Sequence, residues 1–308
     1  MNNGEPIKIA IFNQKGGVGK TTFTFNGAGI MAKTFGKKVL VIDADPQKNV
    51  STTLLAENIR EWEEENNEDF FESHITLGDC LENINDKDLV NKAIIKAKIL
   101  AKNGGACKWR GIDVLPSKRS LAGIEVGDNE DIKKLVDRIR PTREHMYNYD
   151  IILFDMPPYL SDLSVTVLAG CDFVVTPATV DKDSLAGYSE LLDTIKNLQV
   201  LGINPKIKSI GIFLTMIDNI TKYDKEKYIE IKDALGENMF DVPIRRDSRA
   251  KYASDYGCPL AWYKRNATIT KDFEIVVAEI LKRVDLLEED RFNLLYKEEI
   301  QKRIERYE

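Results

Sequence analysis

A glycine-rich segment from Asn13 to Thr22 contains the clearest chemical signal in the chain. Its sequence is NQKGGVGKTT, and it stands between an apolar run and a helical pattern. Glycines let backbone N–H groups approach a polyphosphate closely, with the dihedral angles that such a loop needs. Lys20 would neutralise the outer phosphates, and Thr21 would place its hydroxyl on Mg²⁺. The residues expected to bind a nucleotide here are Gly16, Gly17, Val18, Gly19, Lys20, Thr21 and Thr22.

Carboxylates follow two other apolar runs, at the points where strands are expected to end. Asp43 and Asp45 come after the run that ends at Ile42, and Asp155 follows the run that ends at Phe154. Ligands of open α/β sheets bind at the carboxyl ends of the strands, so a carboxylate placed there can contact a hydrolytic water. The alternative is that the acids only cap loops. We favour the site, because phosphoryl transfer depends on positioning and charge neutralisation.

Three motifs of this chain resemble those of one ATPase family. An ordinary phosphate-binding loop needs only the second lysine, but this loop also has Lys15, and K-G-G-x-G-K-T-T resembles the deviant Walker A motif of the MinD/ParA family. The segment 43–49 resembles the family's D-x-D-P-Q-x-N switch I. The segment 155–158, DMPP, resembles its D-x-P-P Walker B and switch II. Over most of its length the chain resembles a ParA-type partition ATPase.

The resemblance implies cofactors and residue roles. ATP and Mg²⁺ are the implied cofactors, and the implied activity is Mg-dependent ATP hydrolysis. Lys15 would reach the phosphates of a second copy in an ATP-bound homodimer, and Asp45 would orient the attacking water. The implied catalytic residues are Lys15, Lys20 and Asp45, and the implied metal-binding residues are Thr21, Asp43 and Asp155, the last acting through water.

Two later segments resemble the surroundings of the adenine base in the family. The segment 215–218, TMID, follows an apolar run, and the segment 242–246, VPIRR, resembles the family's I-P-x-x motif. The proline of the second segment falls one position early, which leaves the adenine contacts open. The expected base-binding residues are Met216, Pro243 and Ile244.

A basic group follows the second of these segments and is the expected DNA-binding set: Arg245, Arg246, Arg249 and Lys251. Such side chains could neutralise DNA phosphates without reading sequence. The alternative is a solvated surface with internal salt bridges, because a net charge of −6 gives no general attraction for nucleic acid. The resulting hypothesis is a switch in DNA segregation or cargo positioning. Its ATP-bound dimer would hold DNA non-specifically, and a ParB-like partner would trigger hydrolysis.

Two related functions are alternatives. A MinD-like regulator that cycles on membranes needs a basic amphipathic C-terminal helix, whereas the polar positions of this tail mix Lys, Arg, Glu and Asp. An electron-transfer relative of nitrogenase reductase needs cysteines in glycine-rich contexts around an iron–sulfur cluster. Cys107 follows Gly-Gly-Ala, but Cys171 stands at a plain helix-to-strand junction. We therefore expect neither a membrane partner nor a cluster.

The elements that must position these residues follow from the apolar runs at 7–12, 38–42, 150–154, 172–176 and 209–214. Short runs rich in Ile, Val, Leu and Phe, without strict alternation, are typical of strands buried on both faces of a parallel sheet. Helical patterns stand between them, first near Lys20 and again from Asp183 to Leu201. This order predicts a doubly wound, mostly parallel α/β sheet flanked by helices, the P-loop NTPase fold, with a C-terminal helical extension.

We expect residues 1–308 to form a single P-loop ATPase domain with two additions. The segment 57–73 contains eight acids against one arginine, and we interpret it as a solvated helix or loop, with a partner-docking surface as the alternative. The tail from about 266 to 308 has helical periodicity, with apolar positions that include Phe292 and Leu295. We interpret the tail as a segment that packs on the domain or on a second copy.

Composition limits the class of protein. A chain of 308 residues with 43% hydrophobic and 31% charged residues is typical of a globular protein whose core needs no disulfides. No apolar run approaches the roughly 20 residues that span a bilayer, and the N-terminus lacks the regions of a signal peptide. His74 and His145 have no motif around them, so we expect surface positions for both. We expect a cytoplasmic protein, associated with the nucleoid if it binds DNA.

Overall fold

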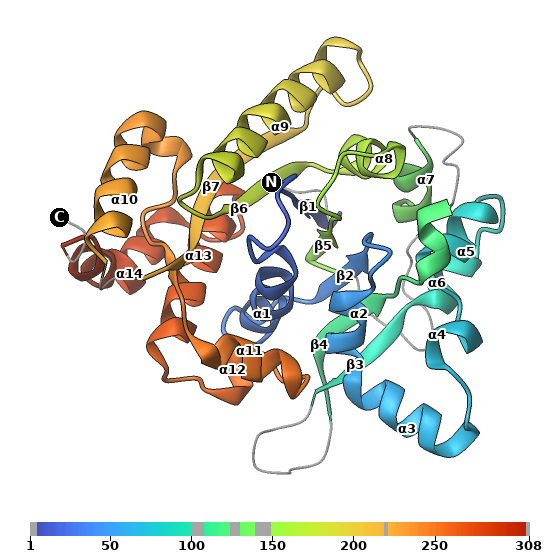
Figure 1. The fold of residues 1–308 in the computed structure, drawn as a ribbon. Coiled ribbons are helices and arrows are strands. Elements are labelled where there is room, and N and C mark those ends of the chain that lie inside the picture. The colour runs from blue at the N-terminus through green and yellow to red at the C-terminus, as the bar shows by residue number, and fades with distance from the viewer. Residues whose placement is uncertain (1–4, 100–107, 124–129, 139–148, 219–220, 306–308) are drawn as a thin grey trace.

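The computed structural model describes residues 5–99, 108–123, 130–138, 149–218 and 221–305, and its centre is an eight-stranded sheet (Figure 1). The strand order is β3-β4-β2-β5-β1-β6-β7-β8. All neighbouring strands are parallel except β3 and β4, which are antiparallel. The strands are β1 (Ile7–Ile11), β2 (Val39–Asp43), β3 (Ile95–Ile99), β4 (Lys108–Leu115), β5 (Ile151–Asp155), β6 (Phe173–Ala178), β7 (Lys208–Ile217) and β8 (Ile244–Arg245).

Helices cover both faces of the sheet (Figure 1). They are α1 (Lys20–Lys33), α2 (Asn49–Leu54), α3 (Ala56–Asn66), α4 (Phe70–Ser73), α5 (Leu77–Glu82), α6 (Leu89–Ala93), α7 (Asp131–Val136), α8 (Asp162–Gly170), α9 (Lys182–Val200), α10 (Lys222–Leu235), α11 (Ser248–Asp255), α12 (Leu260–Tyr263), α13 (Thr268–Arg283) and α14 (Glu289–Ile304). Two 3₁₀ turns, Arg119–Gly123 and Gly236–Asn238, complete the described elements. One core joins α1, α2, α4 and α11–α14 to the sheet, and a second core joins α5–α9 to its other face.

Alternation along the strands assigns side chains to these two cores. In β1, Ile9 and Ile11 enter the core beside α1, whereas Ala10 enters the opposite core. Successive side chains of a strand point to opposite faces, so a strand buried on both faces reads as a continuous apolar run. The doubly wound, mostly parallel fold that the sequence predicts is therefore confirmed, and the five predicted runs are strands β1, β2, β5, β6 and β7.

The acidic segment folds as helices α3 and α4 beside the core. Phe70 and Phe71 are buried, and Trp62 packs against the same core. His74 is half-buried and stacks on Phe70, with ring centroids 4.0 Å apart, so it is less exposed than we expected. The aromatic residues of the segment thus anchor it while most of its acids face solvent. His145 lies outside the described residues.

The tail forms helices α13 and α14, which pack on the domain itself. Phe292, Tyr296 and Ile300 are buried at a spacing of four residues, which places them on one face of α14. Leu295 was expected on that face, but it is half exposed. It directly precedes Tyr296 in the sequence, and neighbouring residues of a helix point in different directions. The tail therefore contributes to the core beside α1, as the packing interpretation requires.

Strand register brings the predicted acids to one edge of the sheet. Asp43 and Asp155 are direct partners at the ends of β2 and β5, and Asp155 is also the partner of Ile11 at the end of β1. The glycine-rich loop follows β1, so the loop and both acids meet at the carboxyl edge of the sheet. This edge is where open α/β sheets bind ligands.

Candidate nucleotide site

The glycine-rich loop borders a cavity of about 350 Å³ at this edge. Gly17 and Gly19 have φ angles of 76° and 88°, which are strained for other residues. Helix α1 begins at Lys20, directly after the loop, so its N-terminus faces the space where an anion would lie. The cavity is lined by Gly16, Gly17, Gly19, Lys20, Thr21, Thr22, Asp45, Gln47, Asn49, Pro158 and Met216. The structure thus joins the loop, the Asp45 segment and the switch II segment in one site.

Lys20 lies inside this loop and is bound by it. Its Nζ donates to the carbonyl oxygens of Asn13 and Lys15, at 2.9 Å each. Burial lowers the pKa of Lys20 to about 8, although the charges of Asp155 and Asp45 oppose the shift. A phosphate group would give this buried ammonium a full counter-charge in place of carbonyl dipoles.

Val18 faces inward rather than toward the cavity. Its side chain is buried, and its carbonyl oxygen accepts a hydrogen bond of 2.8 Å from the hydroxyl of Thr215. Only the backbone of Val18 is therefore placed where a nucleotide could contact it. Thr215 ties the back of the loop to the end of β7.

Lys15 extends away from the cavity of its own chain. Its Nζ lies 2.9 Å from Oδ2 of Asp183, in the first turn of α9, and its side chain is 41% exposed. The hydrogen bond with Asp183, together with the charge of that carboxylate, raises the pKa of Lys15. The two lysines of the loop therefore differ in direction, since Lys20 points inward and Lys15 points to the surface.

Asp155 is joined to α1 by two hydroxyl groups. Thr21 Oγ1 donates to Asp155 Oδ2 at 2.8 Å, and Thr24 Oγ1 donates to Asp155 Oδ1 at 2.7 Å. Thr21 also lines the cavity. The sequence did not indicate Thr24, because a threonine inside a helix has no distinguishing pattern.

Asp43 organises the segment that carries Asp45. Its carboxylate accepts hydrogen bonds from the backbone N–H of Asp45 and from the N–H and hydroxyl of Ser51, at 2.6–3.1 Å. Asp45 in turn accepts from the N–H of Gln47 and lines the cavity, whereas Asp43 is fully buried behind it. Asp45 is thus the carboxylate of this loop that faces the ligand space.

The paired acids Asp43 and Asp155 suit a divalent cation. Burial raises the pKa of both carboxyls, and for Asp43 the neighbouring charge of Asp155 adds to the shift. A cation beside them would offset both the desolvation and the repulsion. The hydroxyl of Thr21 adds another oxygen, and oxygen ligands are those that Mg²⁺ prefers. The residues present therefore fit a magnesium ion.

A second, more apolar cavity of about 680 Å³ adjoins the first. Both include Gly19, Thr22 and Met216, and the Met216 Cε lies 3.5 Å from the ideal Cβ position on Gly19. Ile244 lines the second cavity as expected, whereas Pro243 is buried and does not. The sequence did not indicate Ile269 and Phe273 of α13, whose side chains complete this cavity, because their periodicity is that of ordinary core residues. Together the cavities have room for phosphates and for a base.

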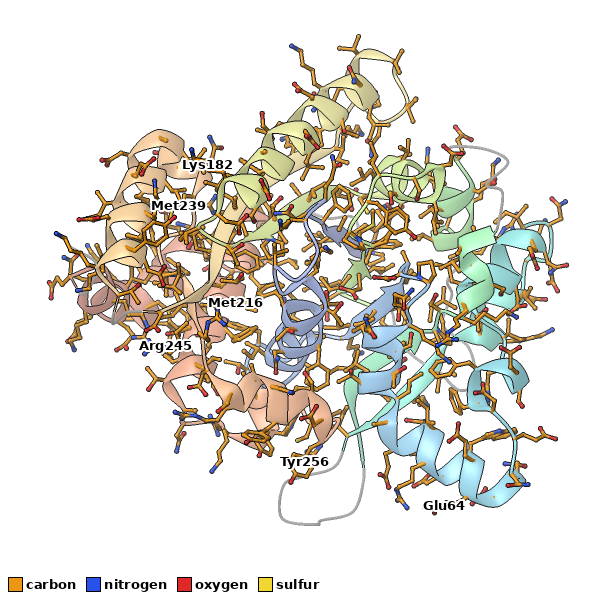
Figure 2. The ribbon with its side chains drawn as sticks, in the orientation of Figure 1. Glu64, Lys182, Met216, Met239, Arg245 and Tyr256 are labelled. Carbon is orange, nitrogen blue, oxygen red and sulfur yellow. The ribbon has the colours of Figure 1, made fainter. Side chains whose placement is uncertain are left out.

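Arg245 is held by a buried acid rather than directed outward. Its Nη2 lies 3.0 Å from Asp272 Oδ1, its Nε also pairs with Asp272, and its side chain is 19% exposed. Arg303 of α14 donates to the same carboxylate at 3.1 Å. Figure 2 shows Arg245 beside Met216, near the second cavity. Arg245 was grouped with the DNA-binding residues, and the structure gives it this internal ion pair instead.

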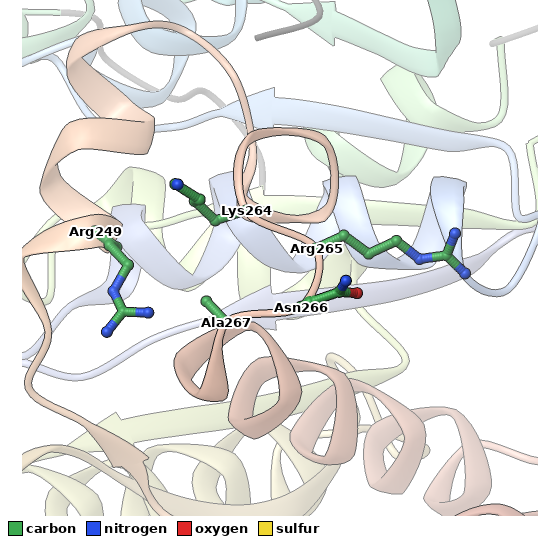
Figure 3. Close-up of a pocket in the computed structure, with 5 residues that line it drawn as sticks. All are labelled: Arg249, Lys264, Arg265, Asn266 and Ala267. Carbon is green, nitrogen blue, oxygen red and sulfur yellow. The ribbon is translucent and has the colours of Figure 1, made fainter.

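The other members of the basic group lie on the surface. Arg246, Arg249 and Lys251 are exposed, and Arg249 also pairs with Asp247 at 3.0 Å. The fold adds two exposed cations that the sequence did not group with them, Lys264 and Arg265. A shallow hollow of about 500 Å³ is lined by Arg249, Lys264, Arg265, Asn266 and Ala267. In Figure 3, Arg249 and Lys264 lie on one side of it and the Arg265 side chain extends to the other.

The structure also bears on the alternative functions. None of the described helices has the length and apolar character to cross a bilayer. Cys80, Cys171 and Cys258 are buried, and burial raises the pKa of each thiol. Within the described ranges, no cluster of His, Cys, Asp and Glu has the composition of a metal site held by three such side chains. Cys107 lies outside the described residues.

The fold and the site define a P-loop nucleotide-binding protein, and comparison with known proteins identifies the family. A family model described as an AAA domain (AAA_31) matches residues 7–209. The sporulation initiation inhibitor protein Soj of Bacillus subtilis is 31% identical over 275 residues, which cover 88% of this chain and 97% of Soj. The chain belongs to the ParA/Soj family of partition ATPases.

Solved structures support the fold. An ATP complex of a McdA variant from Cyanothece matches with a TM-score of 0.68 at 21% identity, over 93% of this chain and 99% of that one. Cobyrinic acid a,c-diamide synthase from Mycobacterium smegmatis, with an ATP analogue and magnesium, matches with a TM-score of 0.69 at 20% identity, over 93% and 97%. At these identities the likeness shows the fold alone.

Proposed function

We propose that this chain is a Mg-dependent ATPase that acts as a dimerising switch in DNA segregation or cargo positioning. The observation that carries the proposal is the opposite direction of the two loop lysines. Lys20 is buried at the phosphate cavity, while Lys15 lies outside it at the surface, paired with Asp183, where a second copy of the chain could reach it. Membership of the ParA/Soj family supports the same proposal.

The proposed roles follow from the geometry of the site. Lys20 and the backbone of Gly16–Thr22 would bind the phosphates, and Met216 with Ile244 would border the base. Thr21, Asp155 and Asp43 would hold Mg²⁺, and Asp43, from behind Asp45, would also fix the Asp45 segment. The magnesium ion supplies charge neutralisation for the phosphates. Asp45, which faces the cavity, would orient the attacking water.

We further propose that the ATP-bound homodimer holds DNA without sequence preference. Arg246, Arg249 and Lys251 would contact phosphates, and Lys264 with Arg265, which share a hollow with Arg249, would add to them. Arg246 and Lys251 also line the second cavity, so they lie between the base and this hollow. Dimerisation would double this surface, which helps a chain whose net charge is −6 to hold a polyanion. A ParB-like partner would stimulate hydrolysis and release. In this role the protein would work in the cytoplasm, on the nucleoid.

The membrane-cycling alternative has less support. Helix α14 buries one face against the domain and mixes acids with bases on the rest, whereas a membrane-surface helix needs a free apolar face and a basic polar face.

An electrophoretic shift of random-sequence DNA, measured with ATP, with ADP and without nucleotide at several salt concentrations, tests the proposal. We expect binding with ATP and Mg²⁺ only, and binding that falls steeply with salt, because each phosphate contact adds about 0.9 to the slope of log K against log salt. Equal binding with and without ATP, or none at low salt, contradicts the DNA-holding role.

A further inference from the structure

Asn13, the residue that precedes the phosphate loop, has a fully buried amide side chain that joins three elements. Its Nδ2 donates to the carbonyl oxygens of Pro177, at the end of β6, and Ser184, in the first turn of α9, at 2.9 and 3.1 Å. Its Oδ1 accepts the backbone N–H of Lys15 at 2.9 Å. These bonds fix the front of the loop to α9, although the residues concerned are up to 171 positions apart in the sequence.

We propose that Asn13 is a positioning residue for Lys15, and that the first turn of α9 is the seat that directs this lysine toward a second copy of the chain. The backbone of Lys15 is held by the Asn13 amide, and its ammonium is held by Asp183 of the same turn. This inference rests on the proposed role of Lys15 in the dimer.

Asn13 also packs closely against Gly187, in the second turn of α9. A Cβ atom placed on Gly187 would lie 2.6 Å from Asn13 Oδ1 and 3.6 Å from the backbone nitrogen of Gln14. Contacts of 2.6 Å are too short for a methyl group, so an alanine at this position forces the Asn13 amide to move by several tenths of an ångström. A glycine inside a helix lowers helix stability by about 1 kcal/mol relative to alanine, so helix propensity alone favours alanine here.

The front and the back of the loop are anchored separately. Asn13 holds the front at Lys15, whereas Thr215 holds the back through the carbonyl oxygen of Val18. A change at Gly187 therefore acts first on Lys15, and the phosphate-binding turn before α1 stays attached to β7. Lys20 is affected only through the carbonyl oxygens of Asn13 and Lys15, to which its Nζ donates. This separation predicts an effect on dimer-coupled turnover that exceeds the effect on ATP affinity.

The test is a double-mutant cycle of Gly187→Ala and Asn13→Ala, with Ser189→Ala as a control at an exposed position of the same helix. ATP affinity is measured with a fluorescent analogue, and kcat is measured with saturating ATP and DNA. Because a displacement approaching 1 Å can lower catalysis by about 100-fold, we expect Gly187→Ala to lower kcat about tenfold and to change the ATP Kd less than about threefold. Ser189→Ala should behave as wild type.

The cycle separates positioning from a general effect on folding. If Gly187→Ala acts through the amide, it has no further effect on kcat in the Asn13→Ala background, because the group that it displaces is gone. If Asn13→Ala does not fold, Asn13→Ser replaces it, since its shorter side chain leaves room for the methyl group. Wild-type kcat in Gly187→Ala, or losses that multiply in the double variant, overturns the inference.

Lys15→Ala, measured in the same assays, distinguishes this inference from the proposed function. Normal dimer-coupled turnover in Lys15→Ala refutes the role of the lysine itself. If Lys15→Ala loses turnover while Gly187→Ala keeps it, the proposed switch stands, and only the positioning of Lys15 by Asn13 and α9 is refuted.

Discussion

Replacement of Asp272 by alanine should strongly destabilise the protein, because this carboxylate is the shared partner of two arginines. Asp272 is fully buried, Arg303 is 4% exposed and Arg245 is 19% exposed. Breaking a buried ion pair from one side leaves an uncompensated charge and costs roughly 3–5 kcal/mol. Arg303 retains Glu299 as a partner, which favours the lower half of this range. With an unfolding entropy of about 2.1 cal/mol/K per residue, a loss of roughly 3–4 kcal/mol lowers Tm by roughly 5–6 °C for a chain of this length.

Thermal unfolding followed by circular dichroism, with urea unfolding as a second probe, measures this loss. Glu298→Ala is the control, because it removes an acid from the exposed Lys302 ion pair on α14 and should leave Tm nearly unchanged. Arg245→Ala should also lower Tm while leaving the salt slope of DNA binding as it was. An Asp272→Ala protein with the wild-type Tm refutes the buried triad, and a reduced salt slope in Arg245→Ala restores this arginine to the DNA surface.

Lys20→Ala should weaken ATP binding by about tenfold or more, because charge-assisted hydrogen bonds to phosphate contribute about 1.5–3 kcal/mol each. The Kd is measured with a fluorescent ATP analogue, and Lys33→Ala, at the exposed end of α1, is the control. Unchanged ATP affinity in Lys20→Ala contradicts the proposed phosphate site. Arg249→Glu should weaken DNA binding and lower the salt slope by about 1 while ATP hydrolysis without DNA is retained. Lys196→Glu, at an exposed position of α9, makes the same change of charge away from the hollow. An equal loss of DNA binding in both variants shows that only the net charge of the protein matters.

The sequence was sufficient to predict the phosphate loop and the strands around it. Local rules apply there, because the loop must follow a buried strand and precede a helix, and the acids must stand at strand ends. Strands β3, β4 and β8 were not predicted. In β4, Gly111 and Asp113 interrupt the apolar run. Lys alternates with apolar residues in β3, which lies at the sheet edge and pairs antiparallel, and β8 has only two residues.

Contacts between distant segments could not be predicted from one sequence. Asp272 pairs with Arg245 and Arg303, which are 27 and 31 residues away, and neither spacing follows a local pattern. The sequence therefore predicted that Arg245 lies on the same surface as the basic residues that follow it, although Arg245 is bound internally by Asp272. The periodicity of the sequence around Phe273 is that of a core residue. Its place at the second cavity depends on the packing of α13 against α1.

The mass of the protein in solution, measured by multi-angle light scattering, tests the central claim most directly. Asp45→Ala should bind ATP and Mg²⁺ but hydrolyse slowly, so its ATP-bound form should persist at twice the mass of one chain. Adding Lys15→Ala to this variant should return the mass to that of one chain without loss of ATP binding. A single-chain mass for Asp45→Ala with saturating ATP and Mg²⁺, or a dimer that persists without Lys15, contradicts a switch that closes through this lysine.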